Sequence, residues 1–243
     1  MRVTDAWWEK RNIGVETQEI TCEEADTADS LKEGLSGLTA GYQVLRVPAG
    51  RADLLFAAQE NGFLLVEDLA KLEIDVDKLV IPAYSERLLA NMTTGPATEE
   101  EINRILTDVR EGKVFQTDRI STDPTFSKAI ADIRFYNWME DLIQAGAAFV
   151  VARYKEKAVA FGINKPVDER LYDAVLGGMC PDAGVTGVGF SGIYANTMSV
   201  KEQGGARAVT RVSSNNLPMI RLHLTMGYQL QEFTYVLVRH VNI

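Results

Sequence analysis

The segment GVTGVGFSG at residues 184–192 constrains the fold of this chain more strongly than any other stretch. Its four glycines permit a tight loop with outward-facing backbone N–H groups. Such a loop directly before a helix is typical of a phosphate-binding site, because the positive end of the helix dipole favours an anion. The last six residues match the GxGxxG pattern of a dinucleotide-binding turn, whereas the first six fit a loop around the pyrophosphate of coenzyme A.

The segments on both sides of this loop argue against a dinucleotide-binding fold. Residues 147–155, 158–166 and 170–179 are extended stretches joined by short turns, which predicts an antiparallel meander rather than a parallel βαβ unit. The extended stretch at 206–214 also lacks the acidic residue that binds a ribose about twenty positions after such a turn. We therefore disfavour the dinucleotide-binding interpretation.

Helix signals precede this meander. Thr98 and Glu101 form a capping box that predicts a helix over residues 98–112. Asp123, followed by proline, predicts the start of a second helix that ends at Gly146.

The remaining signals define the fold class. After the glycine loop we expect a helix over residues 190–203, a strand, a helix that begins at Asn216 and a last strand at 232–241. The first third alternates strand and helix signals. The prediction is an α/β (α+β) fold, in which a small N-terminal αβ domain (residues 1–85) precedes a mixed, mostly antiparallel sheet flanked by helices (residues 86–243).

The residues around the glycine loop resemble the GNAT acetyltransferase superfamily. In that family a strand leads through a proline and an Arg/Gln-x-x-Gly-x-Gly/Ala loop into a helix. The stretch CPDAGVTGVG supplies Pro181, Gly187 and Gly189, with Gly184 in place of the Arg/Gln. A second family pattern, Val-x-x-x-Asn before a helix that ends in Gly-Phe, resembles VSSNNLPMIRLHLTMGY. Its matching residues are Asn216, Met219, Leu222, Gly227 and Tyr228.

The resemblance narrows to a subgroup, the TDP-fucosamine acetyltransferases. WWEKRNIG near the N-terminus and the segment FQTDRISTDPTFSKAIADIRFYNWMEDLI are similar to segments of these enzymes. Asp118, Arg119 and Ile120 stand for the subgroup's Ser-Arg-Phe, although the Tyr-to-Trp gap that follows is shorter here. The resemblance implies that Arg119, Tyr136 and Trp138 contact the acceptor, a small-molecule amine, with a nucleotide-linked amino sugar as the first candidate.

The family resemblance implies acetyl-CoA as the co-substrate. Main-chain N–H groups at the end of the strand before the loop would bind the pantetheine and the thioester carbonyl, and those of the loop would bind the pyrophosphate. Asn216 would cap its helix and touch the same molecule. The implied cofactor-binding residues are Gly178, Met179, Cys180, Gly184, Val185, Thr186, Gly187, Val188, Gly189, Phe190 and Asn216.

Catalysis would need a proton donor for the thiolate and a base for the amine. His223 stands where the family usually has a tyrosine, so we expect it to be the general acid; a helix histidine without a role is the alternative. Glu169 and Asp173 are the base candidates, against the alternative of surface carboxylates beside a turn. A catalytically weak acyl-CoA-binding sensor or scaffold of the same fold is the rival function.

Charge and cysteine content exclude several other classes. The net charge of −9, without a basic stripe, argues against a nucleic-acid partner. The two cysteines and two histidines lack metal-ligand spacing, so we expect no metal. No apolar run is long enough for a membrane span, which predicts a cytoplasmic chain with free thiols. Beyond the amine, the expected partner is a second copy of the chain in a homodimer.

Overall fold

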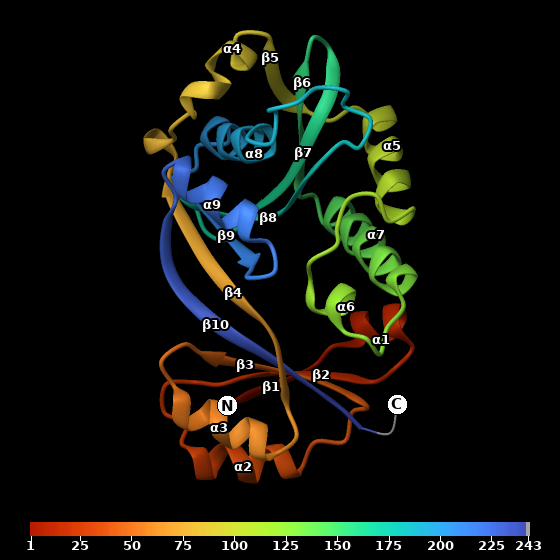
Figure 1. The fold of residues 1–243 in the computed structure, drawn as a ribbon, viewed down its shortest axis with the longest axis vertical. Coiled ribbons are helices and arrows are strands. Elements are labelled where there is room, and N and C mark those ends of the chain that lie inside the picture. Colours follow the sequence, from red (N-terminus) through yellow and green to blue (C-terminus); the bar gives the residue numbers. More distant parts are fainter. Residues whose placement is uncertain (242–243) are drawn as a thin grey trace.

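The computed structural model describes residues 1–241 and confirms the α/β fold class (Figure 1). The ten strands are β1 (Arg2–Asp5), β2 (Thr17–Thr21), β3 (Tyr42–Pro48), β4 (Leu64–Asp75), β5 (Met92–Pro96), β6 (Ala148–Tyr154), β7 (Lys157–Pro166), β8 (Leu171–Met179), β9 (Arg207–Ser213) and β10 (Gln229–His240). They form one sheet in the order β1-β2-β3-β10-β4-β9-β8-β7-β6-β5. Neighbouring strands are antiparallel except in the pairs β2–β3 and β8–β9, so the sheet is mixed and mostly antiparallel.

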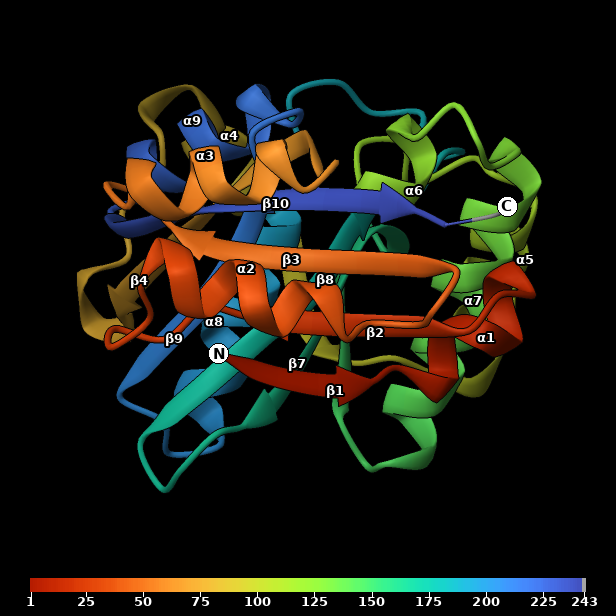
Figure 2. The same ribbon diagram turned by 90° about the horizontal axis from the view of Figure 1, so that it is seen from below.

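Helices cover both faces of this sheet. The α-helices are α1 (Trp7–Ile13), α2 (Ala28–Ser36), α3 (Ala52–Glu60), α4 (Glu86–Leu89), α5 (Glu99–Arg110), α6 (Arg119–Thr122), α7 (Lys128–Gln144), α8 (Ser191–Glu202) and α9 (Leu217–Thr225), with 3₁₀ turns at Val76–Lys78 and Ala83–Ser85. Helices α2 and α3 cover β2, β3 and β10 at one end of the molecule (Figure 2). Helices α5 and α7 pack on one face of β6–β8, and α8 packs on the other.

The C-terminal strand β10 pairs with two strands from the first third of the chain. β10 lies between β3 and β4, and it pairs antiparallel with both. The sheet is therefore continuous across residue 85, where the sequence predicts a domain boundary. The division into residues 1–85 and 86–243 stays a prediction.

Local signals placed most elements correctly. Helix α5 has the predicted capping box between Thr98 and Glu101, and Asn216 caps α9 through a bond from the Met219 N–H. The predicted meander appears as β6–β8, and α8 follows the glycine loop. The sequence patterns did not predict β1 and β5, which are the short strands at the two edges of the sheet.

The predicted helix start at Asp123 is wrong. Helix α7 begins at Lys128, and Asp123 instead follows the short helix α6. Its carboxylate accepts the Thr125 N–H at 3.0 Å and lies 2.8 Å from Nε2 of His240. Asp123 therefore holds a turn against the C-terminal strand rather than capping α7.

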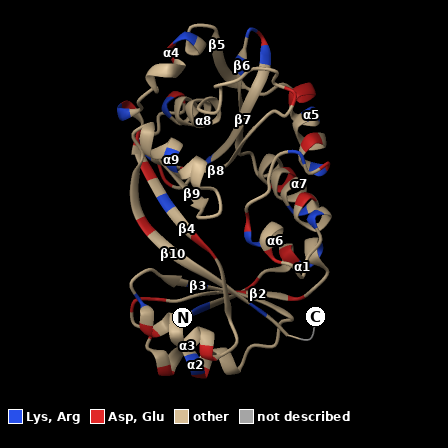
Figure 3. Cartoon of the chain, in the orientation of Figure 1, with Lys and Arg blue, Asp and Glu red and all other residues tan. Residues whose placement is uncertain are grey.

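Acidic and basic side chains are interspersed over the helices, as α5 and α7 illustrate (Figure 3). Within residues 1–241, none of the helices combines the length and the apolar character that crossing a bilayer requires.

Candidate active site

Strands β8 and β9 separate from each other along their length. They pair in parallel only from Leu171 with Arg207 to Asp173 with Val209. On its other edge, β8 stays paired with β7 as far as Met179. Beyond Asp173, β8 therefore has no backbone pairing with β9. The Ala174 and Leu176 carbonyls instead accept side-chain hydrogen bonds from Thr210 and Asn196, and the remaining groups of this edge need another partner.

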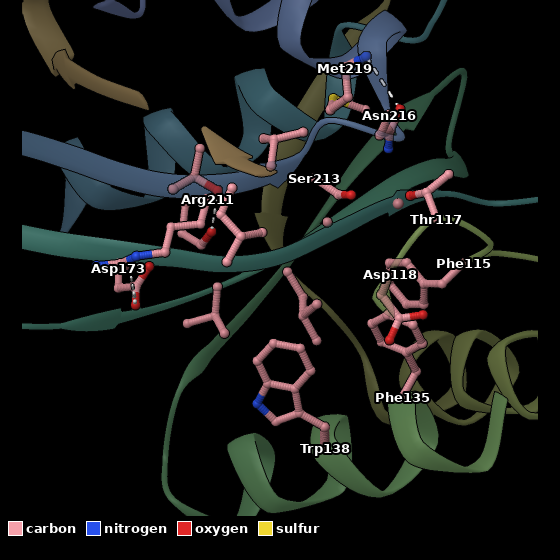
Figure 4. Close-up of a pocket in the computed structure, with 18 of the residues that line it drawn as sticks. Phe115, Thr117, Asp118, Phe135, Trp138, Asp173, Arg211, Ser213, Asn216 and Met219 are labelled. Carbon is pink, nitrogen blue, oxygen red and sulfur yellow. Dashed lines mark hydrogen bonds and ion pairs between the residues drawn. The ribbon is translucent and has the colours of Figure 1, made fainter. Parts of the chain in front are cut away.

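A cavity of about 930 Å³ lies at this separation. It is lined by β8, β9, α8 and α9 on one side and by α7, α1 and the segment before α6 on the other. In Figure 4, Asn216 and Met219 lie across the cavity from Trp138, while Asp173 and Arg211 lie together at one end. The volume falls in the range typical of small-molecule sites.

The glycine loop at 184–190 lies next to this cavity. Among residues 1–241, no acceptor receives a hydrogen bond from a backbone N–H between Gly184 and Phe190. Gly184 and Gly187 adopt φ values of 66° and 79°, which glycine tolerates without strain. Since the twelve-residue helix α8 starts directly after the loop, its positive dipole end adds to these free N–H groups. The loop can hold a phosphate in the manner expected from the sequence.

The structure brings some of the expected cofactor residues to the cavity. Gly178, Met179, Gly189 and Asn216 line it. The other loop residues up to Val188 do not line it. Cys180 is buried, with its N–H bonded to the Val159 carbonyl, and Phe190 is 1% exposed in the core. These last two residues fix the ends of the loop by packing.

His223 lines the cavity on α9 but is only 7% exposed. Its Nδ1 lies 2.9 Å from the Met219 carbonyl oxygen, which accepts a hydrogen, so Nδ1 carries the proton. Burial lowers the pKa of His223 to about 4, against the smaller opposing effect of this hydrogen bond. The ring is therefore neutral at pH 7, with an acceptor lone pair on Nε2.

Tyr228 packs edge-on against the His223 ring, with 4.8 Å between the ring centroids, and also lines the cavity. Burial raises the pKa of Tyr228 to about 12, although the Thr197 hydroxyl opposes the shift. The Thr197 hydroxyl donates to the Ile193 carbonyl, so Tyr228 donates its own hydrogen to Thr197 at 2.9 Å. Neither ring thus directs a free hydrogen into the cavity.

The two base candidates lie in different places. Asp173 lines the cavity, 3.8 Å from Arg211. Burial raises the pKa of Asp173, while Arg211 and Lys165 oppose the shift. Glu169 is exposed in the turn before β8 and does not line the cavity. The glycine loop follows the other end of β8, about 30 Å away along a nine-residue strand.

Of the three residues expected to contact the acceptor, two line the cavity and one does not. Trp138 and Arg119 line the cavity, but Arg119 is 7% exposed and pairs with the buried Glu9. Tyr136 lies outside the lining, where its hydroxyl donates to Glu140 at 2.7 Å. The structure therefore brings Trp138 and Arg119, but not Tyr136, to the cavity.

Sequence reasoning missed several lining residues from the first third of the chain, namely Arg11, Glu19, Arg46 and Glu67. Glu67 carried a usable signal, because it is a carboxylate on the same strand face as Leu69, within an apolar run. The other residues reach the cavity only through the long-range pairing of β10 with β3 and β4.

Several solved structures have an architecture similar to that of this chain. A functionally unknown conserved protein from Staphylococcus epidermidis superposes with a TM-score of 0.61 at 14% identity, over 93% of this chain and 84% of that one. A GCN5-related N-acetyltransferase from Kribbella flavida gives 0.56 at 13% identity, over 97% and 83%. A GCN5-related glucosamine N-acetyltransferase region of a fungal multi-domain β-N-acetylglucosaminidase gives 0.55 at 13% identity, over 81% and 25%.

The sequence matches no protein-family model and no curated protein. At these identities the likeness concerns architecture, including the mostly antiparallel sheet and the flanking helices. The chain has the fold of GCN5-related N-acetyltransferases.

Proposed function

We propose that the chain is an acetyl-CoA-dependent N-acetyltransferase that acts by direct transfer on the amine of a small molecule. The observation that carries the proposal is the separation of β8 from β9 beside a glycine loop whose N–H groups have no acceptor in residues 1–241. The unpaired edge of β8 suits the amide groups of pantetheine, and the loop suits the pyrophosphate. Both lie at the same cavity, which extends beyond them to hold an acceptor.

The geometry supplies what acetyl transfer requires. Backbone N–H groups near Gly178 and Met179 polarise the thioester carbonyl. The neutral amine attacks the carbonyl carbon, the new C–N bond forms and the C–S bond breaks. One amine proton goes to a base, and the departing thiolate takes up a proton from the solvent. The site thus acts mainly by holding the two reactants in contact.

For the acceptor we propose an amino sugar, with a nucleotide-linked one as the first candidate. Trp7, Trp8 and Trp138 line the cavity, and indole side chains are suited to stacking on a sugar ring or a nucleobase. The fungal region that shares this fold is described as a glucosamine N-acetyltransferase. A nucleotide-linked amino sugar would use the same aromatic surface for its base.

Release of free thiol from acetyl-CoA tests the proposal. We expect release with at least one amine of a panel of glucosamine, a nucleotide-linked amino sugar, putrescine and phenethylamine, and none without an amine. Mass spectrometry should show acetylated amine in equal amount to the thiol. Tight binding of coenzyme A without release on any of the four amines would contradict the proposal.

His223 gives a second test within this function. A general acid contributes about a hundredfold or more, but with a pKa of about 4 only about one ring in a thousand is protonated at pH 7. We therefore expect kcat of His223→Phe at pH 7.5 to fall by less than about threefold, while coenzyme A still binds. A hundredfold fall, with wild-type kcat rising as the pH falls toward 4, would instead support the general-acid role.

A further inference from the structure

Glu67 is a buried carboxylate at the wall of the cavity, on the strand contributed by the first third of the chain. It lies on β4, lines the cavity and is only 7% exposed. Its Oε2 is fully enclosed and has no hydrogen-bond partner within residues 1–241. A buried polar atom without a partner costs free energy, which a ligand group placed there would offset.

The charges around the cavity single out this carboxylate. Its other acidic lining residues each face an arginine: Asp141 with Arg11 at 2.7 Å, Glu19 with Arg46 at 2.9 Å, Asp118 with Arg134 at 3.1 Å and Asp173 with Arg211 at 3.8 Å. Within the described part of the chain, Glu67 has no basic group at ion-pair distance. Each of those arginines is already paired. Among the described residues, the cavity therefore carries one carboxylate without an ion-pair partner, which suits a cationic ligand.

Glu67 also lies at the place where the two reactants would meet. The pairing of β4 with β9 ends at Leu69 and Ser213. Glu67 lies on β4, two residues beyond Leu69. The Ser214 hydroxyl accepts the Asp68 N–H at 2.9 Å, which holds the end of β9 against this part of β4. The chain continues from this end of β9 into Asn216 and α9. The same end of β9 lies opposite the half of β8 that β9 does not pair with.

We infer that Glu67 binds the amine of the acceptor and takes its proton during acetyl transfer. The inference rests on the proposed function and deepens it, because it makes the first third of the chain part of the acceptor site. The acceptor class is a primary amine that arrives as a cation. Glu67 first accepts one proton from the ammonium group, which leaves a neutral amine with a free lone pair. The nitrogen then attacks the thioester carbon and the C–S bond breaks with its electron pair on sulfur. The second proton that the nitrogen loses passes through solvent to the departing thiolate.

The surroundings of Glu67 suit a base. Burial raises the pKa of Glu67, while Ser213, Arg119 and Arg134 oppose the shift and Asp118 adds to it. A raised pKa makes the carboxylate a stronger proton acceptor than an exposed one. Since only the ionised form accepts a proton, activity should decline as the pH falls through this raised pKa.

Glu67→Gln tests the inference with acetyl-CoA and the best amine of the panel as probes. We expect kcat/KM to fall about a hundredfold or more and to lose its decline at acidic pH, while the Kd for coenzyme A stays within about twofold. Glu67→Asp, which keeps the carboxylate but shortens the chain, should recover part of the activity and the acidic decline. Glu73→Gln is the matched control, because Glu73 lies on β4 outside the cavity lining and pairs with Arg207.

The outcomes separate this inference from the proposed function. A wild-type enzyme that is active, with Glu67→Gln within about threefold of it, overturns the role of Glu67 and leaves the function standing. Equal losses in coenzyme A affinity and turnover overturn the role as well, because they indicate a structural effect. A wild-type chain that is inactive on every amine overturns both.

Discussion

Glu9→Gln is expected to lower the free energy of unfolding by about 3–5 kcal/mol, a large part of the stability of a domain. Glu9 is 0% exposed, and it is the shared partner of two arginines on other elements. Removing one partner of a buried ion pair leaves the other charge uncompensated in a low-dielectric site. Here a single substitution removes the buried partner that Arg119 and Arg134 share, and it leaves them only Glu19 at 3.4 Å and Asp118 at 3.1 Å.

The geometry around Glu9 explains the size of this effect. Nε and Nη2 of Arg134 donate to the carboxylate at 2.7–2.9 Å, and Nη2 of Arg119 donates to its Oε1 as well. Burial alone would raise the pKa of Glu9, but the two guanidinium groups outweigh it and lower the pKa to about 2. Because α1 carries Glu9 while α6 and α7 carry the arginines, this cluster fastens the N-terminus to the helices that wall the cavity.

Urea unfolding at pH 7 measures the change. The control is Glu16→Gln, which breaks an exposed ion pair with Lys10 and should cost less than about 1 kcal/mol. The folded-state pKa of Glu9 lies below the unfolded value of 4.5, so its stabilisation is present above pH 4.5 and is lost as the pH falls toward 2. The Gln variant should lack this acid-dependent loss. A cost similar to that of Glu16→Gln would contradict the prediction.

The features that the sequence predicted are those that depend on neighbouring residues. The capping box of Thr98 and Glu101, the glycines of the loop and the cap at Asn216 each act within a few positions of the chain, so their pattern is enough. Asp123 shows the limit, because its partner His240 is 117 residues away. The Asp123 carboxylate, which could have capped a helix, instead contacts His240 on β10.

The acceptor side of the cavity could not be predicted for the same reason. Glu67 reaches the cavity wall and Glu9 reaches its two arginines only when β10 enters between β3 and β4 and brings the first third of the chain against β9 and α7. Nothing near Glu9 in the sequence distinguishes it from an exposed helix glutamate. The sequence interpretation treated the first third as a separate domain, and it therefore did not predict that β3 and β4 contribute Arg46 and Glu67 to the wall of the same cavity.

Gly189→Asp is expected to weaken the binding of coenzyme A by nearly a thousandfold. Gly189 is the glycine-loop residue that lines the cavity, so its side chain would enter the place proposed for the pyrophosphate. An added Cβ would meet only Leu222, at 3.9 Å, and the φ of Gly189 is not positive, so the fold should accept the change. Two like charges about 4 Å apart at an effective dielectric constant near 20 repel by about 4 kcal/mol, which corresponds to that loss of affinity.

Calorimetric titration with two ligands makes the test specific for charge. Gly189→Asn has nearly the same volume without the charge, so its Kd for coenzyme A should stay within about tenfold of wild type. Pantetheine lacks the pyrophosphate, and it should bind both variants alike. Equal losses in the Asp and Asn variants would indicate crowding rather than repulsion, and wild-type affinity in Gly189→Asp would place the phosphates away from the loop. Since the free N–H groups of this loop carry the proposed function, that second result would remove its main support.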